Sequence, residues 1–143
     1  MKLVDVNVLV YAVDRRSPFH ASVRSWWERA LSADEAIGLP WIVLLGFLRV
    51  TTSARVFVQP LTIVAAIDQV EEWLSHPNVR LVRETDAHWR ILRELLSQTG
   101  TAANLTTDAH LAALAISHGA TLASCDADFA RFRHLRWENP AAV

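Results

Sequence analysis

The stretch LTTDAHLAALAISHGATLASCDADF, residues 105–129, carries most of the information about the fold. It predicts a buried helix that starts at Thr107 and continues through the apolar residues after it. Gly119 is expected to end that helix, because glycine readily adopts the left-handed conformation that follows a helix. Residues 121–123 are then predicted to form a short strand that leads to Asp126. A helix followed by a strand is half of the repeating unit of a parallel sheet.

The same alternation extends over the whole chain. The predicted strands are residues 3–4, 36–39, 79–82, 121–123 and 135–137. The predicted helices are residues 7–11, 17–31 with Ser17-Pro18 at the start, 41–50 after Pro40, 62–74, 86–99 closed by Gly100, and 107–118. A chain of 143 residues with 52% hydrophobic and 20% charged residues is the size and composition of one globular domain. We therefore expect a single α/β domain over residues 1–143, with a parallel sheet of about five strands between two helical layers (a three-layer α/β/α architecture).

Three aspartates are expected to meet at one edge of this sheet. Ligands of parallel α/β sheets bind beyond the carboxyl ends of the strands. Asp5 follows the first strand, Asp126 follows the fourth, and Asp108 lies in the first turn of the helix before it. Each aspartate alone could simply cap a helix. Together they would repel one another unless a cation neutralised them, and oxygen ligands favour Mg²⁺ or Mn²⁺.

A divalent cation at such a site favours hydrolysis of phosphodiesters, since it activates water and stabilises the leaving oxygen. The six histidines show no paired metal-ligand spacing, so we interpret them as surface or helix-packing residues. The lone Cys125 excludes an internal disulfide and a multi-cysteine zinc site, and favours a reducing cytoplasm. The apolar opening, residues 3–13, is too short to cross a bilayer, so no membrane association is expected.

Net charge is −1, so no overall positive field would attract nucleic acid. Affinity for RNA must come from local clusters among the thirteen arginines. The candidate clusters are Arg15 with Arg16, Arg49 with Arg55, and Arg131 with Arg133 and Arg136.

With these residues in place, the chain resembles a PIN-domain ribonuclease, specifically a VapC-type toxin of a type II toxin–antitoxin system, in a mycobacterial-type branch. The resemblance covers nearly the whole chain. Its carriers are LVDVNVLVYAV (3–13), PWIVLLGFLRVTTSARVF (40–57), LTTDAHLAALAISHGATLASCDADFARF (105–132) and LRWENP (135–140). The D-x-N opening is a weak signal alone and becomes specific in combination with TDAHLAALA and CDADF.

The resemblance implies that Asp5, Asp108 and Asp126 are the catalytic acids that bind the metal. It also implies that Asn7 helps to position the site and that Asp128 is a further ligand or a hydrogen-bond acceptor beside it. Thr107 would orient Asp108. The family further implies an RNA substrate, a homodimer, and inhibition by a VapB-type antitoxin whose C-terminal segment blocks the active edge.

One position departs from the family pattern, which usually has a glutamate in the third helix where this chain has Gly46. One carboxylate fewer should weaken cation binding, so we predict one well-occupied metal and a second only with substrate. The alternative is a catalytically weakened PIN domain that binds RNA or an antitoxin without cleavage. Receiver domains and haloacid-dehalogenase-type phosphatases are less compatible, because both need a lysine late in the chain and Lys2 is the only lysine.

Overall fold

A computed structural model describes residues 1–99 and 105–142 of the chain. Its centre is a five-stranded sheet in the order β3-β2-β1-β4-β5, and every pair of neighbours is parallel. The strands are β1 (Lys2–Val4), β2 (Ile37–Pro40), β3 (Val79–Val82), β4 (Thr121–Ala123) and β5 (Arg136–Glu138). The predicted parallel sheet of about five strands is therefore confirmed, with strand ends shifted by one residue at most.

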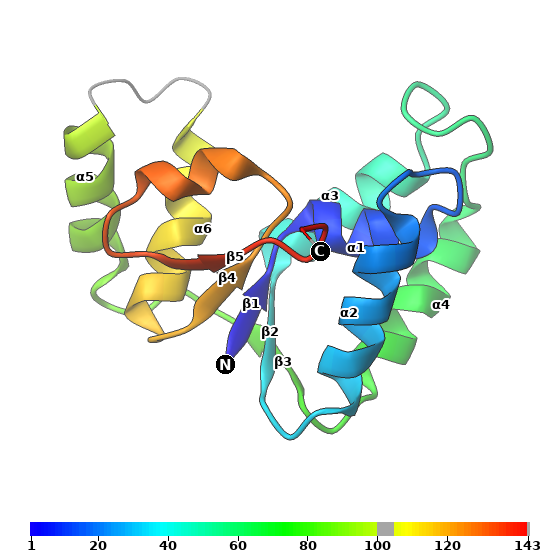
Figure 1. The fold of residues 1–143 in the computed structure, drawn as a ribbon, viewed down its shortest axis with the longest axis horizontal. Helices are drawn as coiled ribbons and strands as arrows, with labels where there is room; N and C mark the ends of the chain where they lie inside the picture. The colour runs from blue at the N-terminus through cyan, green and yellow to red at the C-terminus, as the bar shows by residue number, and fades with distance from the viewer. Residues whose placement is uncertain (100–104, 143) are drawn as a thin grey trace.

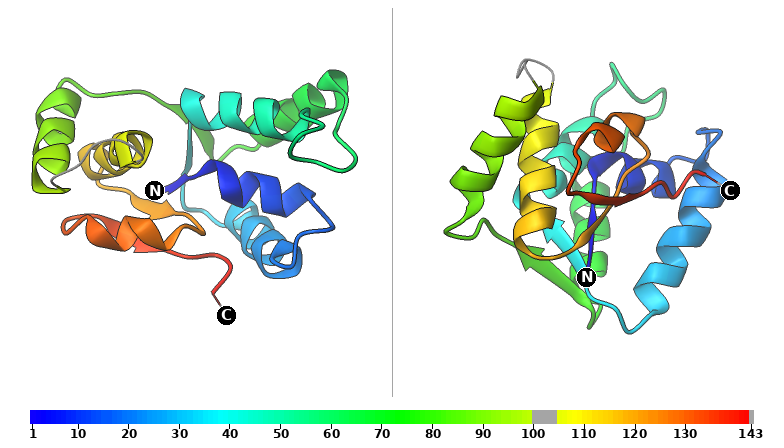
Figure 2. Two further views of the ribbon diagram at one scale, coloured as in Figure 1. Left: turned by 90° about the horizontal axis from the view of Figure 1, so that it is seen from above. Right: turned by 60° about the vertical axis from the view of Figure 1, so that its left-hand side comes forward.

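Helices cover both faces of this sheet. They are α1 (Val6–Val13), α2 (His20–Ser32), α3 (Trp41–Thr51), α4 (Ile63–Leu74), α5 (His88–Thr99), α6 (Thr106–Ser117) and the short 3₁₀ helix η2 (Ala127–Arg131). Figure 1 shows α1 to α4 on one side of the strands and α5 with α6 on the other, and the views in Figure 2 agree. The expected three-layer α/β/α architecture is present. Within the described residues, no helix is both long and apolar enough to cross a membrane.

The order of the strands reverses between β1 and β4. The chain first builds outward from β1 to β2 and β3, then returns to add β4 and β5 on the other side of β1. Leu3 pairs with Leu122 and Val4 with Ala123, so Asp5 and Ser124 leave the sheet side by side. The backbone N–H of Asp5 donates to the carbonyl oxygen of Ala123 at 3.0 Å. Ligands of open α/β sheets bind at this kind of switch point.

The core explains why the strands are apolar without alternation. Leu3, Val4, Leu122 and Ala123 are fully buried, because helices cover the sheet on both faces. In α6, Ala109 and the residues 111–115 are buried as well, which confirms the predicted buried helix. Gly119 follows α6 with a φ of 61°, the left-handed conformation expected where the helix ends.

Several predicted helix starts differ from the structure. The helices expected from residues 62, 86 and 107 begin at Ile63, His88 and Thr106. The second helix begins at His20 rather than at Ser17, because residues 17–20 form a hydrogen-bonded turn and the Ser17 hydroxyl accepts the N–H of Phe19 at 3.1 Å. The first helix starts one residue earlier than expected, at Val6, whose N–H is bound by the Asp5 carboxylate. Gly100, the predicted end of α5, lies outside the described residues.

Candidate metal centre

Three carboxylates converge beyond the carboxyl ends of β1 and β4. Asp108, Asp126 and Asp128 each place a carboxylate oxygen within 4.8 Å of the others. Asp108 comes from the first turn of α6, Asp126 caps η2 by accepting the N–H of Asp128 at 2.9 Å, and Asp128 lies in the first turn of η2. The structure thus brings Asp108 and Asp126 together as predicted. It also places Asp128 as close to them as a direct ligand would be.

Asp5, the other expected ligand, is not part of this group of three within the described residues and is held by hydrogen bonds. It is only 9% exposed. Its Oδ1 accepts the N–H of Val6 at 2.7 Å, and its Oδ2 accepts the Ser124 hydroxyl at 2.7 Å. Its charge still reaches the group, because Asp126 raises the pKa of Asp5 and Asp5 raises the pKa of Asp108. Asp5 therefore belongs to the same acidic rim.

Asn7 ties the start of α1 to the residues after β4. Its amide nitrogen donates to Ser124 Oγ at 3.2 Å and to Asp5 Oδ2 at 3.3 Å, and its Oδ1 accepts the N–H of Cys125 at 3.0 Å. These contacts support the positioning role expected of Asn7. Thr107 is exposed in the first turn of α6, and its role in orienting Asp108 stays a prediction.

Ser124 is the residue that the sequence reading missed. It is fully buried, donates to Asp5, and its oxygen accepts the N–H of Asp126 at 3.1 Å. One hydroxyl thus connects the acid after β1 with the acid after β4. Ser124 could have been predicted from its position opposite Asp5, one residue past the end of the neighbouring strand. That position is known only once β4 is known to pair with β1.

The electrostatics of the rim favour a cation. Burial and the charges of Asp126, Asp5 and Asp128 together raise the pKa of Asp108 to about 6, against the opposing charge of Arg131. Burial also raises the pKa of Asp5, against the hydrogen bonds from Ser124 and Val6. A divalent cation bound by hard oxygen ligands would relieve this repulsion. The donor set therefore fits Mg²⁺ or Mn²⁺.

Gly46 is buried in α3 against the helix that follows Asp5. A Cβ built at Gly46 would lie 2.6 Å from Cγ2 of Val6, so the Val6 side chain occupies the space that any side chain at position 46 would need. Where the family usually has a glutamate, this chain therefore has close packing of α1 on α3. A Gly46→Glu variant would therefore change packing as well as charge.

The histidines lie outside this group of acids. His88 of α5 and His110 of α6 face each other, with Nε2 and Nδ1 3.0 Å apart. This contact supports the helix-packing interpretation for these two residues.

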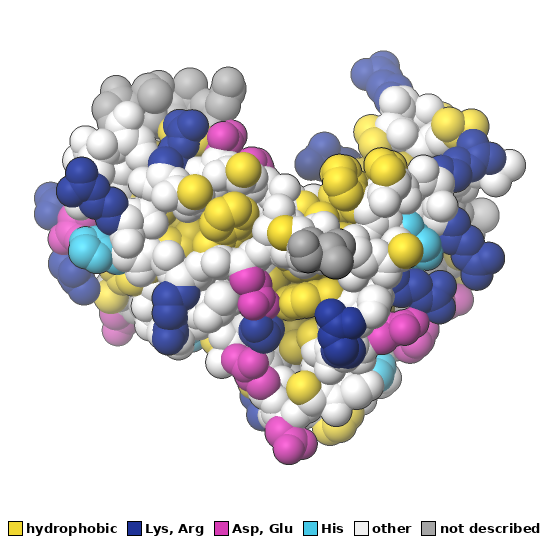
Figure 3. All heavy atoms as spheres, in the orientation of Figure 1, with side chains coloured by type: hydrophobic (Ala, Val, Ile, Leu, Met, Phe, Trp, Pro, Cys, Tyr) yellow, Lys and Arg dark blue, Asp and Glu magenta, His cyan; other side chains and the backbone are white. Residues whose placement is uncertain are grey.

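Figure 3 shows how the rim meets the surface. The molecule is hollowed at the top of this view, between the side formed by α6 and η2 and the side formed by α1 and the segment before α4. Acidic side chains lie on one wall of this notch, and basic side chains appear on both sides of it. An extended anionic chain that crossed the notch would therefore pass the carboxylates between flanking cations.

The chain is similar to known proteins over nearly its whole length. The model of the PIN domain family matches residues 2–135. Ribonuclease VapC37 of Mycobacterium tuberculosis (strain ATCC 25618 / H37Rv) is 46% identical over 143 residues, which cover 100% of this chain and 99% of that protein. Ribonuclease VapC33 of the same strain is 45% identical over 140 residues, which cover 98% of each.

Solved structures share the fold. VapBC2 from Rickettsia felis, bound to a DNA fragment from its promoter, gives a TM-score of 0.71 at 22% identity, covering 96% of this chain and 97% of that chain. The sarcin–ricin loop cleaving toxin VapC20 of Mycobacterium tuberculosis gives 0.64 at 17% identity, covering 95% and 99%. The family match and the similarity to the curated relatives extend over nearly the full chain. The chain therefore belongs to the PIN-domain family, within its group of VapC ribonucleases.

Proposed function

We propose that the chain is a divalent-metal-dependent endoribonuclease and the toxin of a type II toxin–antitoxin module. The observation that carries the proposal is the convergence of Asp108, Asp126 and Asp128 at the switch point of the sheet. The relatives named as ribonucleases, which match over 99% and 98% of their lengths, support the same activity. They favour it over the alternative of a weakened domain that binds RNA or an antitoxin without cleavage.

The chain's own residues have two tasks in this account. Asp108, Asp126 and Asp128 would hold the cation, and the charge of Asp5 acts on Asp108 in the same group of acids. Ser124 and Asn7 fix the Asp5 carboxylate by donating to its Oδ2. When bound, a divalent cation makes water more acidic and stabilises the charge that develops on the phosphate and on the leaving oxygen. Hydrolysis adds the water oxygen to phosphorus and breaks the bond to the leaving ribose oxygen, which takes up a proton.

The proposal includes a homodimer and a VapB-type antitoxin in the cytoplasm, where the RNA substrate would be found. Structures with the same fold include VapBC complexes from Rickettsia felis and Salmonella typhimurium. Large apolar side chains are exposed on α3 and α4 of this chain, which supports burial against a partner. They are Trp41, Ile42, Leu45, Ile63, Val64 and Ile67.

The test is incubation of purified protein, free of antitoxin, with RNA and Mg²⁺ or Mn²⁺. We expect cleavage that is abolished by EDTA and by Asp126→Asn. Asp34→Asn is the matched control, because Asp34 is exposed before β2 and belongs to no group of acids within the described residues. RNA binding without cleavage in the wild-type protein would instead establish the weakened domain.

A further inference from the structure

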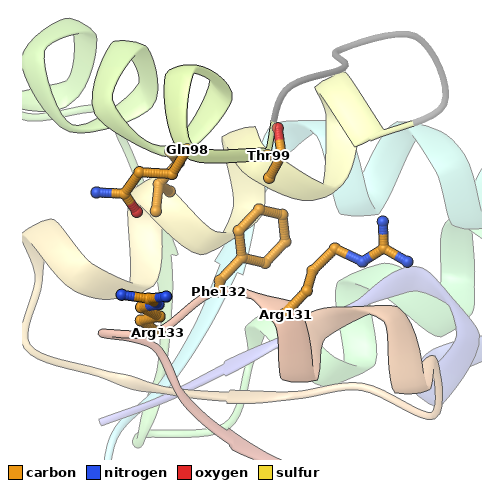
Figure 4. A pocket seen from close by; sticks show the side chains of 6 residues that line it. Gln98, Thr99, Arg131, Phe132 and Arg133 are labelled. Atoms are coloured by element: carbon orange, nitrogen blue, oxygen red, sulfur yellow. The ribbon is translucent and has the colours of Figure 1, made fainter.

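A second site lies next to the acidic rim, between the last turns of α5 and the end of η2. It is a hollow of about 530 Å³, which is in the range of small-molecule binding sites. Its lining residues are Leu95, Gln98, Thr99, Arg131, Phe132 and Arg133. In Figure 4, Gln98 and Thr99 form one side, and Arg131 and Arg133 flank the ring of Phe132 on the other.

The chemistry of the lining selects for an anion with an apolar or planar portion. Leu95 and Phe132 are almost fully buried and form an apolar floor. The six lining residues include two guanidinium groups and no carboxylate. Gln98 adds an amide that can donate and accept hydrogen bonds. Guanidinium groups bind phosphate oxygens in a bidentate manner, so the lining suits a nucleotide.

The two arginines are available for a ligand. Within the described residues, Arg133 is exposed and has no hydrogen bond or ion pair. Arg131 has a single carboxylate partner, Asp128, at the long distance of 3.5 Å, and both side chains are about half exposed. Exposed pairs of this kind contribute little stability. Arg136 is different, because it already donates to the carbonyl oxygen of Gly119 and does not line the hollow.

Arg131 connects the hollow to the acidic rim. In a 3₁₀ helix, side chains three residues apart lie on the same face. The Arg131 side chain therefore lies beside that of Asp128, although their backbones are one turn apart, a rise of about 6 Å. Its charge lowers the pKa of Asp108 as well. A ligand that spans the hollow and the proposed cation site must therefore carry one negative group at the cation and another one in the hollow. A polynucleotide has such repeated phosphates.

We infer that this hollow is a binding subsite for the RNA nucleotide next to the cleaved phosphodiester, with Arg131 and Arg133 contacting successive phosphates on the two sides of the Phe132 ring. The inference rests on the proposed ribonuclease function and extends it from the acids to a substrate contact. It favours RNA over an acidic peptide, because Arg131 is shared between the hollow and the rim.

The test uses Arg133→Ala, which removes an unpaired exposed side chain and should leave folding intact. Arg80→Ala is the control, since Arg80 is exposed on β3 at the opposite edge of the sheet. The probe is a short fluorescein-labelled single-stranded RNA, with binding followed by fluorescence anisotropy in EDTA at several salt concentrations. We expect Arg133→Ala to weaken binding roughly fivefold and to lower the salt slope by about 0.7, the value for one phosphate contact on a single strand.

Cleavage kinetics give the second readout. Arg133→Ala should raise KM with little change in kcat, because Arg133 binds a part of the substrate that does not react. Unchanged RNA binding in Arg133→Ala, or an equal loss in Arg80→Ala, would overturn the inference while leaving the cleavage proposal intact. Loss of antitoxin binding with RNA binding retained would overturn it in favour of a protein ligand. Failure of the wild-type protein to cleave RNA would reject the nuclease function separately.

Discussion

At the scale of single residues, the site depends on one hydroxyl as much as on its acids. Ser124 is fully buried and has three partners in the rim, namely Asp5, Asn7 and the N–H of Asp126. It donates to a carboxylate that burial would otherwise push toward the neutral form. Its oxygen also holds the backbone of Asp126, a proposed metal ligand, and loss of a group that orients a metal ligand typically costs about 10- to 100-fold in metal affinity.

Ser124→Ala should therefore weaken Mn²⁺ binding about 10- to 100-fold. It should also destabilise the fold by about 1–3 kcal/mol, because the Asp5 oxygen and the Asp126 N–H lose a buried partner. Isothermal titration calorimetry and thermal unfolding measure the two effects. Ser97→Ala is the control, since among the described residues the exposed Ser97 hydroxyl donates to the carbonyl oxygen of Arg93 in its own helix and to nothing in the rim. Equal effects of the two variants would show that Ser124 has no particular role in metal binding.

Metal binding should also depend on pH through Asp108. Its pKa is raised to about 6, above the ordinary value of 3.8, so below pH 6 a proton competes with the cation for this carboxylate. Mn²⁺ affinity should rise by about tenfold per pH unit below pH 6 and level off above it. In the metal-free protein the sign for stability is opposite, because the folded state loses stability relative to the unfolded chain as Asp108 ionises. A Mn²⁺ affinity that stays constant from pH 5 to pH 7 would contradict this role of Asp108.

The aspartates themselves could be predicted from the sequence, because each follows a strand or opens a helix. Asp128 was given a secondary place, since its position in the first turn of η2 depends on a short 3₁₀ helix that has no apolar periodicity. Ser124 was missed because its partners lie 117 and 119 residues away. The spacing of apolar and capping residues predicts local structure, whereas the Ser124 hydroxyl bonds to residues that are distant in the sequence.

At the scale of elements, the packing of α1 on α3 accounts for Gly46. The Val6 side chain lies where a Cβ at position 46 would be. Valine is branched at Cβ and confined to few rotamers, so it yields little room. Gly46, the residue that departs from the family pattern, therefore fits together with Val6 of the neighbouring helix.

Gly46→Ala should therefore destabilise the fold, although alanine favours helix formation by up to about 1 kcal/mol. Overpacking costs typically 1–3 kcal/mol, so a net loss of about 1 kcal/mol is expected in chemical denaturation. The double variant Val6→Ala with Gly46→Ala should recover part of that loss, a coupling that a double-mutant cycle detects. Additive losses would show that Val6 is not what excludes the side chain. Gly46→Ala also serves as the packing control for any test of a carboxylate with Gly46→Glu.

Element types followed from apolar spacing and capping residues, and several ends were predicted well. Thr62 caps α4 by accepting the N–H of Ala65, and β3 spans the residues predicted for it. Ser17 misled because its hydroxyl serves a turn that precedes α2 rather than the helix itself. A serine before proline favours both arrangements, and tertiary packing selects between them.

At the scale of the whole molecule, the strand order makes these residues into one site. The alternation of strands and helices predicts a parallel sheet, but it does not state which strands are neighbours. Placing β4 next to β1 brings Asp5 beside Ser124 and opens the rim where α6 and η2 deliver Asp108 and Asp126. That arrangement joins residues from both ends of the chain, so their convergence could be expected from the switch-point rule but not located from the sequence.

The measurement that tests this convergence most directly is a calorimetric Mn²⁺ titration of the wild-type protein, Asp126→Asn and Asp34→Asn. We expect one saturable site per chain in the wild-type protein and in Asp34→Asn, and a loss of affinity of at least about tenfold in Asp126→Asn. Wild-type Mn²⁺ affinity in Asp126→Asn, or no saturable binding in the wild-type protein, would contradict the claim that these carboxylates share a cation.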